Sequence, residues 1–267
     1  MTDTGGEIVL GRPRVHLRRT GSTNDCARQL AISGAPHGTL VTASEQTAGR
    51  GRQGRHWTAP AGSSLLASLL LRSPPPLLPL IAAVAVCDIA GDDAQIKWPN
   101  DIVLVGDQRV AQLAETGIRA GGACLPASVG PLVSSKTLCK LAGILVEGRP
   151  QEGWAVLGIG LNVAVRLEEL PAGLRAGAAS MGQSEAEIEP ALERLLEALK
   201  RRLQEPAQAT LEAWRARDAL RGHVVTWAAG RGRAEGIDGE GRLIVARAAG
   251  GYTALDAGEV HLELPGQ

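Results

Sequence analysis

The chain has 267 residues, 44% of them hydrophobic and 21% charged, a composition that supports a globular core and excludes extensive disorder. Its 28 basic and 28 acidic residues balance, so overall charge favours neither DNA nor an anionic membrane as a partner, although local basic patches are possible. The four cysteines have no zinc-ligand spacing and are too few for a disulfide framework, so we expect no protein-bound metal ion.

Three further features indicate a soluble, cytoplasmic protein. The cysteine usage fits a reducing compartment. The N-terminal residues contain no apolar segment of the kind found in signal peptides. The longest uncharged apolar run, residues 73–87, contains four prolines and is too short to cross a bilayer, so we expect no membrane association.

The first part of the chain alternates strands with helices. Ser22–Asp25 precede a helical pattern that ends at Gly34, a typical sequence of cap residue, helix and glycine. A helix that is apolar on all sides is expected at 78–90. Apolar runs of strand length between turn residues predict strands at 38–44, 63–72, 95–98, 101–105, 141–148 and 154–165.

The second part changes character twice. Ser184 and Glu187 have the spacing of a capping box and predict the start of an amphipathic helix at roughly 185–204. A second helix is expected near 207–220. Beyond it, short strands separated by glycine-rich turns predict a small barrel, with strands at 222–228, 232–238, 242–248, 252–256 and 259–264.

These patterns divide the chain into two predicted domains, 1–218 and 219–267. The second is close to the lower size limit for independent folding, so we expect it to pack against the first. Residues 107–138 are rich in glycine, alanine, serine and proline and show little periodicity, although 109–118 could form two or three helical turns.

The sequence GRGRQG at 49–54 matches the glycine pattern of a dinucleotide-binding loop, but its surroundings do not fit that motif. Pro60 and Gly62 interrupt the helix that should follow, and no acidic residue lies about 20 positions downstream. The residues suggest a mobile loop whose arginines bind phosphate or carboxylate oxygens and whose Trp57 covers a planar ring. A solvated loop and an RNA contact remain alternatives.

Lysine is rare in this chain, with four among the 28 basic residues: Lys97, Lys136, Lys140 and Lys200. A lysine provides a compact, movable charge that an arginine cannot replace. Two of the four lie in short motifs. KWPND at 97–101 places Lys97 and Asp101 around a proline turn, and KLAGILVE at 140–147 starts a strand in which Gly143 allows close approach of the backbone.

A third motif, GIGLNV at 158–163, contains Asn162, whose amide could pair with an adenine edge. Each motif alone could be structural. Together with GSTND at 21–25 and AGRGRQGRHW at 48–57, and in this order, the five motifs resemble those of biotin protein ligases. The resemblance covers most of residues 20–165.

The resemblance implies an α+β fold. In biotin protein ligases, the catalytic domain is similar to class II aminoacyl-tRNA synthetases and lipoate ligases and contains a mixed β-sheet. A small SH3-like barrel follows it. The resemblance also implies a reaction that uses ATP, biotin and Mg²⁺. Biotin and ATP give biotinyl-5′-AMP, and biotin then passes to one lysine of a biotin carboxyl carrier protein.

The resemblance also implies roles for individual residues. Lys140 would bridge the biotin carboxyl group and the α-phosphate, Asp101 would orient the acceptor lysine, and Asn162 would bind adenine. The expected catalytic residues are Lys140, Arg52, Asp101 and Lys97. The expected biotin-binding residues are Ser22, Thr23, Asn24, Gln46, Arg50, Gly51, Arg52, Lys140 and Gly143. The expected residues for ATP and the adenylate are Arg50, Arg52, Arg55, Trp57, Asn100 and Asn162.

The sequence departs from the family pattern between the KWPND and KLAGILVE motifs. There, 38 residues separate Asp101 from Lys140, where the family has a short turn. Three interpretations of the additional stretch at 107–138 remain open. It could be a surface loop that the fold tolerates, a lid or an element that docks the carrier protein, or a segment that displaces Lys140 and weakens activity. Only 21 residues precede Ser22, so we expect a ligase without a DNA-binding domain; a homodimer is possible.

Two other functions remain open from the sequence. A lipoate or octanoate ligase has a similar fold, and a non-catalytic module could hold biotin or RNA through the basic loop. Biotin-dependent exchange of pyrophosphate with ATP would distinguish an adenylating biotin ligase from both.

Overall fold

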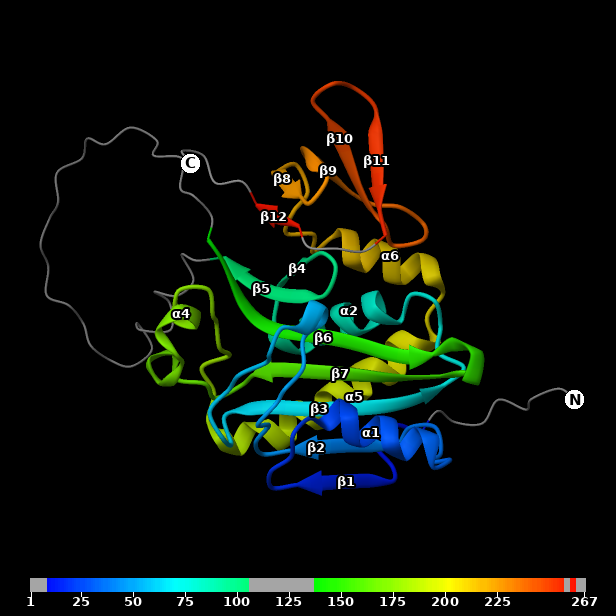
Figure 1. Cartoon of the computed structure of the whole chain (residues 1–267), viewed down its shortest axis with the longest axis vertical. Coiled ribbons are helices and arrows are strands. Elements are labelled where there is room, and N and C mark those ends of the chain that lie inside the picture. Colours follow the sequence, from blue (N-terminus) through cyan, green and yellow to red (C-terminus); the bar gives the residue numbers. More distant parts are fainter. Residues whose placement is uncertain (1–8, 106–136, 257–259, 263–267) are drawn as a thin grey trace, which may run out of the picture.

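The computed structural model describes residues 9–105, 137–256 and 260–262. Its larger part is a seven-stranded sheet in the order β1-β2-β3-β7-β6-β5-β4 (Figure 1). β1 and β2 are parallel, and the remaining neighbours are antiparallel, so the sheet is mixed as expected. The strands are β1 (Arg14–Leu17), β2 (Leu40–Ala43), β3 (Ser64–Arg72), β4 (Gln95–Lys97), β5 (Asp101–Val105), β6 (Leu138–Arg149) and β7 (Trp154–Asn162).

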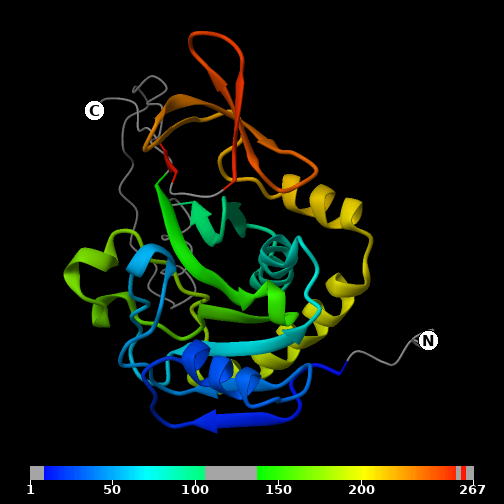
Figure 2. The same ribbon diagram turned by 45° about the vertical axis from the view of Figure 1, so that its right-hand side comes forward.

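Helices cover both faces of this sheet, as the two views in Figures 1 and 2 show. α1 lies on one face, and α2 lies on the other with α5 and α6 behind it. The α-helices are α1 (Thr23–Ile32), α2 (Leu78–Ala90), α4 (Ala172–Arg175), α5 (Ile188–Gln204) and α6 (Ala207–Arg215). Single 3₁₀ turns are η1 (Arg52–Gly54), η3 (Pro150–Glu152), η4 (Leu167–Glu169) and η5 (Glu185–Glu187).

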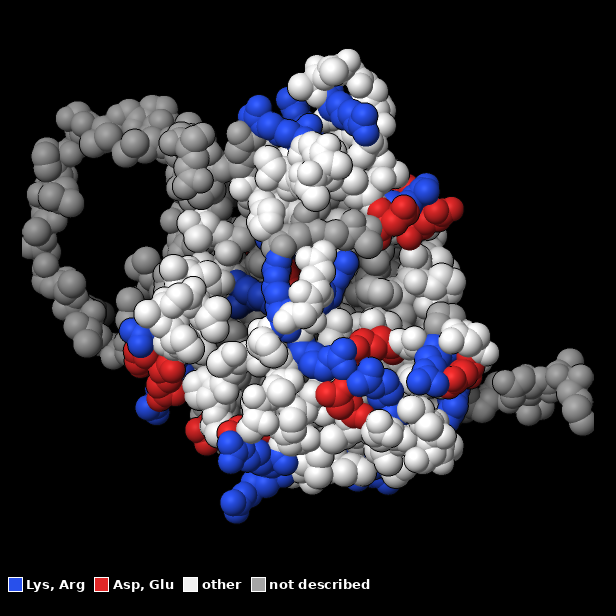
Figure 3. Space-filling view, viewed as in Figure 1, with Lys and Arg blue, Asp and Glu red and all other residues white. Residues whose placement is uncertain are grey.

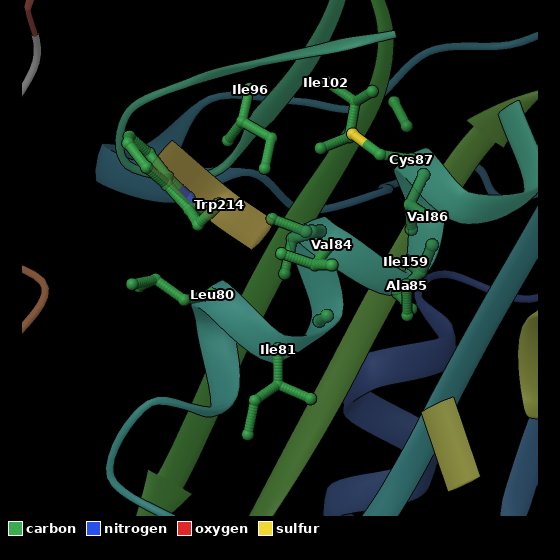
Figure 4. Close-up of a cluster of buried hydrophobic side chains, with 14 of the residues drawn as sticks. Leu80, Ile81, Val84, Ala85, Val86, Cys87, Ile96, Ile102, Ile159 and Trp214 are labelled. Carbon is green, nitrogen blue, oxygen red and sulfur yellow. The ribbon is translucent and has the colours of Figure 1, made fainter. Parts of the chain in front are cut away.

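The alternation of side chains along β3 explains this layering. Leu69 and Leu71 join the main core between the sheet and α2, whereas Leu70 joins the smaller core under α1. α2 can be apolar all round because the sheet and the outer helices enclose it. Figure 4 shows its side chains packed together with Trp214 of α6, which is fully buried.

The C-terminal part is a five-stranded antiparallel sheet in the order β11-β10-β9-β8-β12. Its strands are β8 (Val224–Trp227), β9 (Gly230–Ile237), β10 (Leu243–Arg247), β11 (Tyr252–Leu255) and β12 (His261–Leu262). All five expected strands are therefore present, while closure into a barrel and the boundary at 218/219 stay predictions. The indole N–H of Trp98 donates to the carbonyl of Gly241 at 3.0 Å, so the turn between β9 and β10 packs against the larger part.

Two details of the helices differ from the sequence prediction. Ser184 forms no side-chain cap; its carbonyl accepts from the Glu187 N–H at 3.0 Å, and α5 starts only at Ile188. Pro190 explains this difference, because a residue without an N–H is tolerated only in the first helical turn.

The helix expected near 207–220 is shorter than predicted and ends at Arg215. The chain then runs beside β4, where Ile96 donates its N–H to the Arg217 carbonyl and Ala219 donates to the Ile96 carbonyl. These two hydrogen bonds to β4 take the place of the helical hydrogen bonds that a longer α6 would form.

Some further differences concern single elements. β1 was not predicted, because its polar–apolar alternation covers only four residues and these are mostly exposed. The helical turns suggested for 109–118, and nearly all of the inserted stretch 107–138, lie outside the described residues. Within the described ranges, no helix combines the length and apolar character needed to cross a membrane.

Candidate active site

A cavity of about 120 Å³ lies above β6 and β7, under the loop 48–57. It collects thirteen of the fifteen residues that the sequence singled out, namely Ser22, Thr23, Asn24, Gln46, Arg50, Gly51, Arg52, Arg55, Trp57, Asn100, Asp101, Lys140 and Gly143. Figure 3 shows lysine and arginine side chains gathered at the centre of this face, below the C-terminal strands. The two exceptions are Lys97 and Asn162.

Polar groups meet at one end of the cavity, where α1 begins. Gln46 Oε1 accepts from the backbone N–H of Thr23 at 2.7 Å and from its hydroxyl at 3.0 Å. Ser68 Oγ lies 2.8 Å from Thr23 Oγ1 and 2.6 Å from Asn24 Oδ1. Three segments distant in the sequence are thus held together by amide and hydroxyl groups suited to a neutral polar ligand.

Ser68 belongs to the polar end of the cavity and was not predicted from the sequence. It is fully buried on β3, in the otherwise apolar run SLLASLLLR. Two serines spaced four apart in that run, Ser64 and Ser68, lie on the face opposite the main core, which was the available signal.

Gly158 makes room for Asn24. A Cβ at this glycine would lie 2.1 Å from Asn24 Oδ1, so no side chain fits there. The Asn24 Nδ2 group donates to Glu147 Oε2 at 2.8 Å. The amide of Asn24 is therefore positioned by protein groups, and any contact it makes with a ligand uses its remaining bonding capacity.

Trp57 lies against the sheet over two more glycines. A Cβ at Gly160 would come within 2.6 Å of the indole ring, and one at Gly143 within 3.1 Å. The indole Nε1 is buried and has no hydrogen-bond partner among the described residues. Ligand pockets typically measure roughly 300–1,000 Å³, so a ligand of biotin's size enters this cavity only if Trp57 or its loop moves.

Lys140 and Asp101 face each other at the other end of the cavity. Lys140 Nζ lies 2.7 Å from Asp101 Oδ1 and 5.7 Å from the centre of the Trp57 ring. Asn100 and Ile144 fix the turn between β4 and β5, because the Asn100 side chain donates to the Ile144 carbonyl at 2.7 Å and the Ile144 N–H donates to the Asn100 carbonyl at 2.9 Å.

More cations lie beside this pair. Burial lowers the pKa of Lys97, and nearby Lys140 and Arg55 lower it further, while Asp101 opposes the shift. Burial also lowers the pKa of Arg52, against the attraction of Asp101. This end of the cavity therefore has an excess of positive charge that an anionic ligand would neutralise.

The position of Lys97 differs from the expected one. It lines a neighbouring cavity of about 40 Å³, together with Arg52 and Arg55, and not the main cavity. Val260, the residue before β12, also lines this small cavity. Burial and the charges of Lys97 and Arg55 lower the pKa of His261 in β12. Nothing in the sequence around His261 indicated that the last described strand reaches the site.

Asn162 does not line the main cavity. Its side chain is buried outside the cavity, accepts from Ser64 Oγ at 3.2 Å and donates to the Ala179 carbonyl at 2.9 Å. Both ends of the amide thus stabilise the link between β3, β7 and the chain after α4. Asn162 therefore has a structural role, and its contact with adenine stays a prediction.

The described residues contain no group of three or more His, Cys, Asp or Glu side chains placed to hold a metal ion. Mg²⁺ that accompanies a nucleotide does not need such a group, because it takes most of its ligands from phosphate and water. Asp101 is the carboxylate in the cavity closest to the expected phosphates, and it is already paired with Lys140.

Comparison with known families agrees with this geometry. The model of the biotin/lipoate A/B protein ligase family matches residues 16–163, more than half of the chain, and the chain belongs to this family. The matched region contains all five motifs.

Two curated relatives are each 34% identical to this chain over the matched residues. The bifunctional ligase/repressor BirA of Bacillus spizizenii is 34% identical over 191 residues, which cover 67% of this chain and 49% of the relative. The biotin–[acetyl-CoA-carboxylase] ligase of Mycobacterium tuberculosis is 34% identical over 168 residues, which cover 58% of this chain and 50% of the relative. The chain thus spans about half the length of these relatives.

Solved structures extend the similarity over nearly the whole chain. Biotin protein ligase from Aquifex aeolicus in complex with biotin and ATP has a TM-score of 0.68 at 22% identity, covering 95% of this chain and 99% of that one. The Leishmania major enzyme in complex with biotinyl-5-AMP has a TM-score of 0.54 at 22% identity, covering 92% and 99%. At these identities the similarity establishes the fold, which confirms the predicted α+β class.

Proposed function

We propose that this protein biotinylates a specific lysine of a biotin carboxyl carrier protein in two steps, through a biotinyl-5′-AMP intermediate. The observation that supports it most directly is the division of one cavity into two ends. Amides and hydroxyls line one end, and Lys140, Arg52 and Asp101 line the other. Such a cavity suits a ligand with a neutral polar ring and an anionic tail.

At the polar end, Ser22, Thr23, Asn24 and Gln46 would face the ureido ring of biotin, which both donates and accepts hydrogen bonds. Gly143 lines the cavity and lets Trp57 and Lys140 lie close to the backbone of β6, because a Cβ there would come within 3.1 Å of both side chains. The apolar wall between the two ends is formed by Ile144, Leu145 and Ile159.

At the cationic end, the biotin carboxylate would attack the α-phosphorus of ATP and pyrophosphate would leave. Two anions must meet, so the required contribution is positioning and charge neutralisation. Lys140 would bridge the two reacting groups, and Arg52, Arg55 and Lys97 would hold the phosphates. Asn100 fixes the turn beside them, and Mg²⁺, bound by the triphosphate and water, would reduce the repulsion.

In the second step, the amine of the acceptor lysine attacks the carbonyl carbon of the mixed anhydride, and AMP leaves. Asp101 would orient the incoming ammonium group and accept its proton. Its carboxylate is 22% exposed beside Lys140, so an acceptor side chain can reach it from solvent.

The partner and the location follow from the same proposal. The names of the curated relatives point to a carboxylase carrier as acceptor, and the balanced charge of the chain gives no reason to add DNA as a partner. We place the reaction in the cytoplasm, where the acceptor and the reduced cysteines are compatible.

One experiment tests the proposal against its alternatives. Purified protein is mixed with ATP, labelled pyrophosphate and either biotin, lipoate or no acid, and the label entering ATP is measured. We expect exchange with biotin and none with lipoate or without acid. Exchange with lipoate alone would identify a lipoate ligase, and no exchange with either acid would favour a non-catalytic module.

A further inference from the structure

Arg50 is held by carboxylates from two other elements. Its Nη1 lies 2.7 Å from Asp25 Oδ1, and its Nη2 lies 2.8 Å from Glu147 Oε1. Asp25 belongs to the first turn of α1 and Glu147 to β6, whereas Arg50 belongs to the loop 48–57. One side chain therefore ties the loop to a helix and to a strand at once.

Glu147 makes a second contact that connects this ion pair with the polar end of the cavity. Its Oε2 accepts from Asn24 Nδ2 at 2.8 Å, while its Oε1 forms the ion pair with Arg50. The Glu147 side chain is 20% exposed, so both charge-assisted bonds are partly shielded from water and salt. The position of the loop and that of Asn24 thus depend on the same carboxylate.

Arg50 has two carboxylate partners, Asp25 and Glu147. Its hydrogen bond to Asp25 and the nearby charge of Glu147 raise the pKa of Arg50. Arg52, by contrast, has a lowered pKa in the cluster with Arg55. Asp25 also pairs with Arg28, so two carboxylates balance two guanidinium groups and leave no net positive charge for a phosphate at that position.

We infer that Arg50, Asp25 and Glu147 form a latch that holds the loop 48–57 on the sheet, and that Arg50 does not bind the phosphates. Glu147 is the positioning residue of this latch, since it contacts both the loop and Asn24. The latch revises the role first given to Arg50. Its consequence for the adenylate rests on the proposed function; its consequence for the ligand-free loop does not.

The first test uses ligand-free protein. Glu147→Gln and Asp25→Asn each remove one charge while keeping a polar group of similar size. Trypsin cleavage after Arg52 and Arg55 is followed by mass spectrometry, because cleavage there requires the loop to leave the sheet. We expect both variants to be cut about tenfold faster than the wild type, the factor that corresponds to roughly 1.4 kcal/mol, and the double variant faster still.

A matched control comes from the same strand end. Glu152 forms a 2.7 Å ion pair with Arg149 outside the cavity, and its other oxygen accepts from the indole of Trp154. Glu152→Gln should leave cleavage in the loop at the wild-type rate. Thermal unfolding of all variants separates local opening of the loop from loss of the fold.

The second test measures retention of the intermediate. Enzyme loaded with biotinyl-AMP from labelled biotin is separated from free ligand, and release of the label is followed. We expect release to be about fivefold to tenfold faster in Glu147→Gln and Asp25→Asn than in the wild type and the Glu152→Gln control. If the wild type formed no adenylate, the proposed function would fail while the cleavage test would still decide on the latch.

Arg50→Met distinguishes the latch from a phosphate ligand. If Arg50 belongs to the latch, this variant should repeat the faster cleavage and the faster release. The inference is overturned if Glu147→Gln and Asp25→Asn are cut and lose adenylate at wild-type rates. It is also overturned if Arg50→Met keeps the loop closed but weakens ATP binding as Arg52→Met does.

Discussion

The ammonium group of Lys140 and the carboxylate of Asp101 are 2.7 Å apart although 38 residues separate them in the chain. The register of β5 and β6 brings them together, because Asp101 pairs with Gly143 and, after a bulge, Val103 pairs with Lys140. This register argues against the interpretation in which the inserted stretch displaces Lys140. It also makes the pair the natural place to test the chemistry.

Lys140→Ala should abolish formation of biotinyl-AMP, with a loss of at least about 100-fold in pyrophosphate exchange, because the bridging charge disappears. The Lys140 side chain is 40% exposed, so the fold should persist. Lys200→Ala on α5 serves as the control and should keep its activity. Adenylate formation near the wild-type rate in Lys140→Ala would remove this residue from the mechanism.

Asp101→Asn should separate the two steps. The amide keeps the size of the side chain but cannot accept a proton, so transfer to the carrier lysine should slow by about 100-fold. Adenylate formation should fall less. Single-turnover transfer from preformed adenylate to carrier protein measures the second step directly, and equal losses in both steps would contradict the assigned role.

Gly158→Ala should weaken biotin binding and destabilise the fold by about 1–3 kcal/mol, because the new methyl group collides with Asn24. Gly173→Ala in α4 is the matched control, since a Cβ there meets no heavy atom within 4 Å. Biotin titration and chemical denaturation of both variants provide the comparison. A Gly158→Ala protein with wild-type affinity would show that Asn24 can move without cost.

Asp88 allows a prediction about pH. Burial alone would raise its pKa, but ion pairs with Arg202 and Arg201 outweigh burial and lower the pKa below the ordinary 3.8. A carboxyl group with a lowered folded-state pKa stabilises the protein above its unfolded pKa, and this contribution is lost as pH falls through the folded pKa.

Asp88→Asn should therefore lower the free energy of unfolding by about 1 kcal/mol at pH 7. The difference from the wild type should shrink as the pH falls below 3.8. Urea unfolding at several pH values measures it. A difference that is constant with pH would mean that the ion pairs do not stabilise the contact between α2 and α5.

Much of the fold could be predicted because its signals are local. The run 78–90 is apolar at nearly every position, and α2 has those bounds. The predicted capping box is absent. Ser184 and Glu187 have the right spacing, but Pro190 shifts the start of the helix. β1 could not be predicted, since an exposed edge strand is defined by its pairing with β2 and not by its own residues.

Site residues that belong to a sequence motif could be predicted. Site residues that only the folded chain brings to the cavity could not. Residues in the five motifs converge on one cavity, whereas Ser68 bonds to Thr23 and Asn24 from a strand with no motif. Asn162 has a role that its motif did not indicate. Its side chain bonds to Ser64 and to the Ala179 carbonyl, and only the packing of β3, β7 and the following chain reveals these bonds.

The bond from Trp98 to the Gly241 carbonyl makes the two sheets depend on each other. Trp98 lies in the turn that also carries Asn100 and Asp101, so this turn is supported from outside by the β9–β10 turn. A chain cut near residue 218 would keep every side chain of the main cavity but lose this support. The small C-terminal sheet thus supports the turn that carries Asp101, and a chain of the first 218 residues would lack this support.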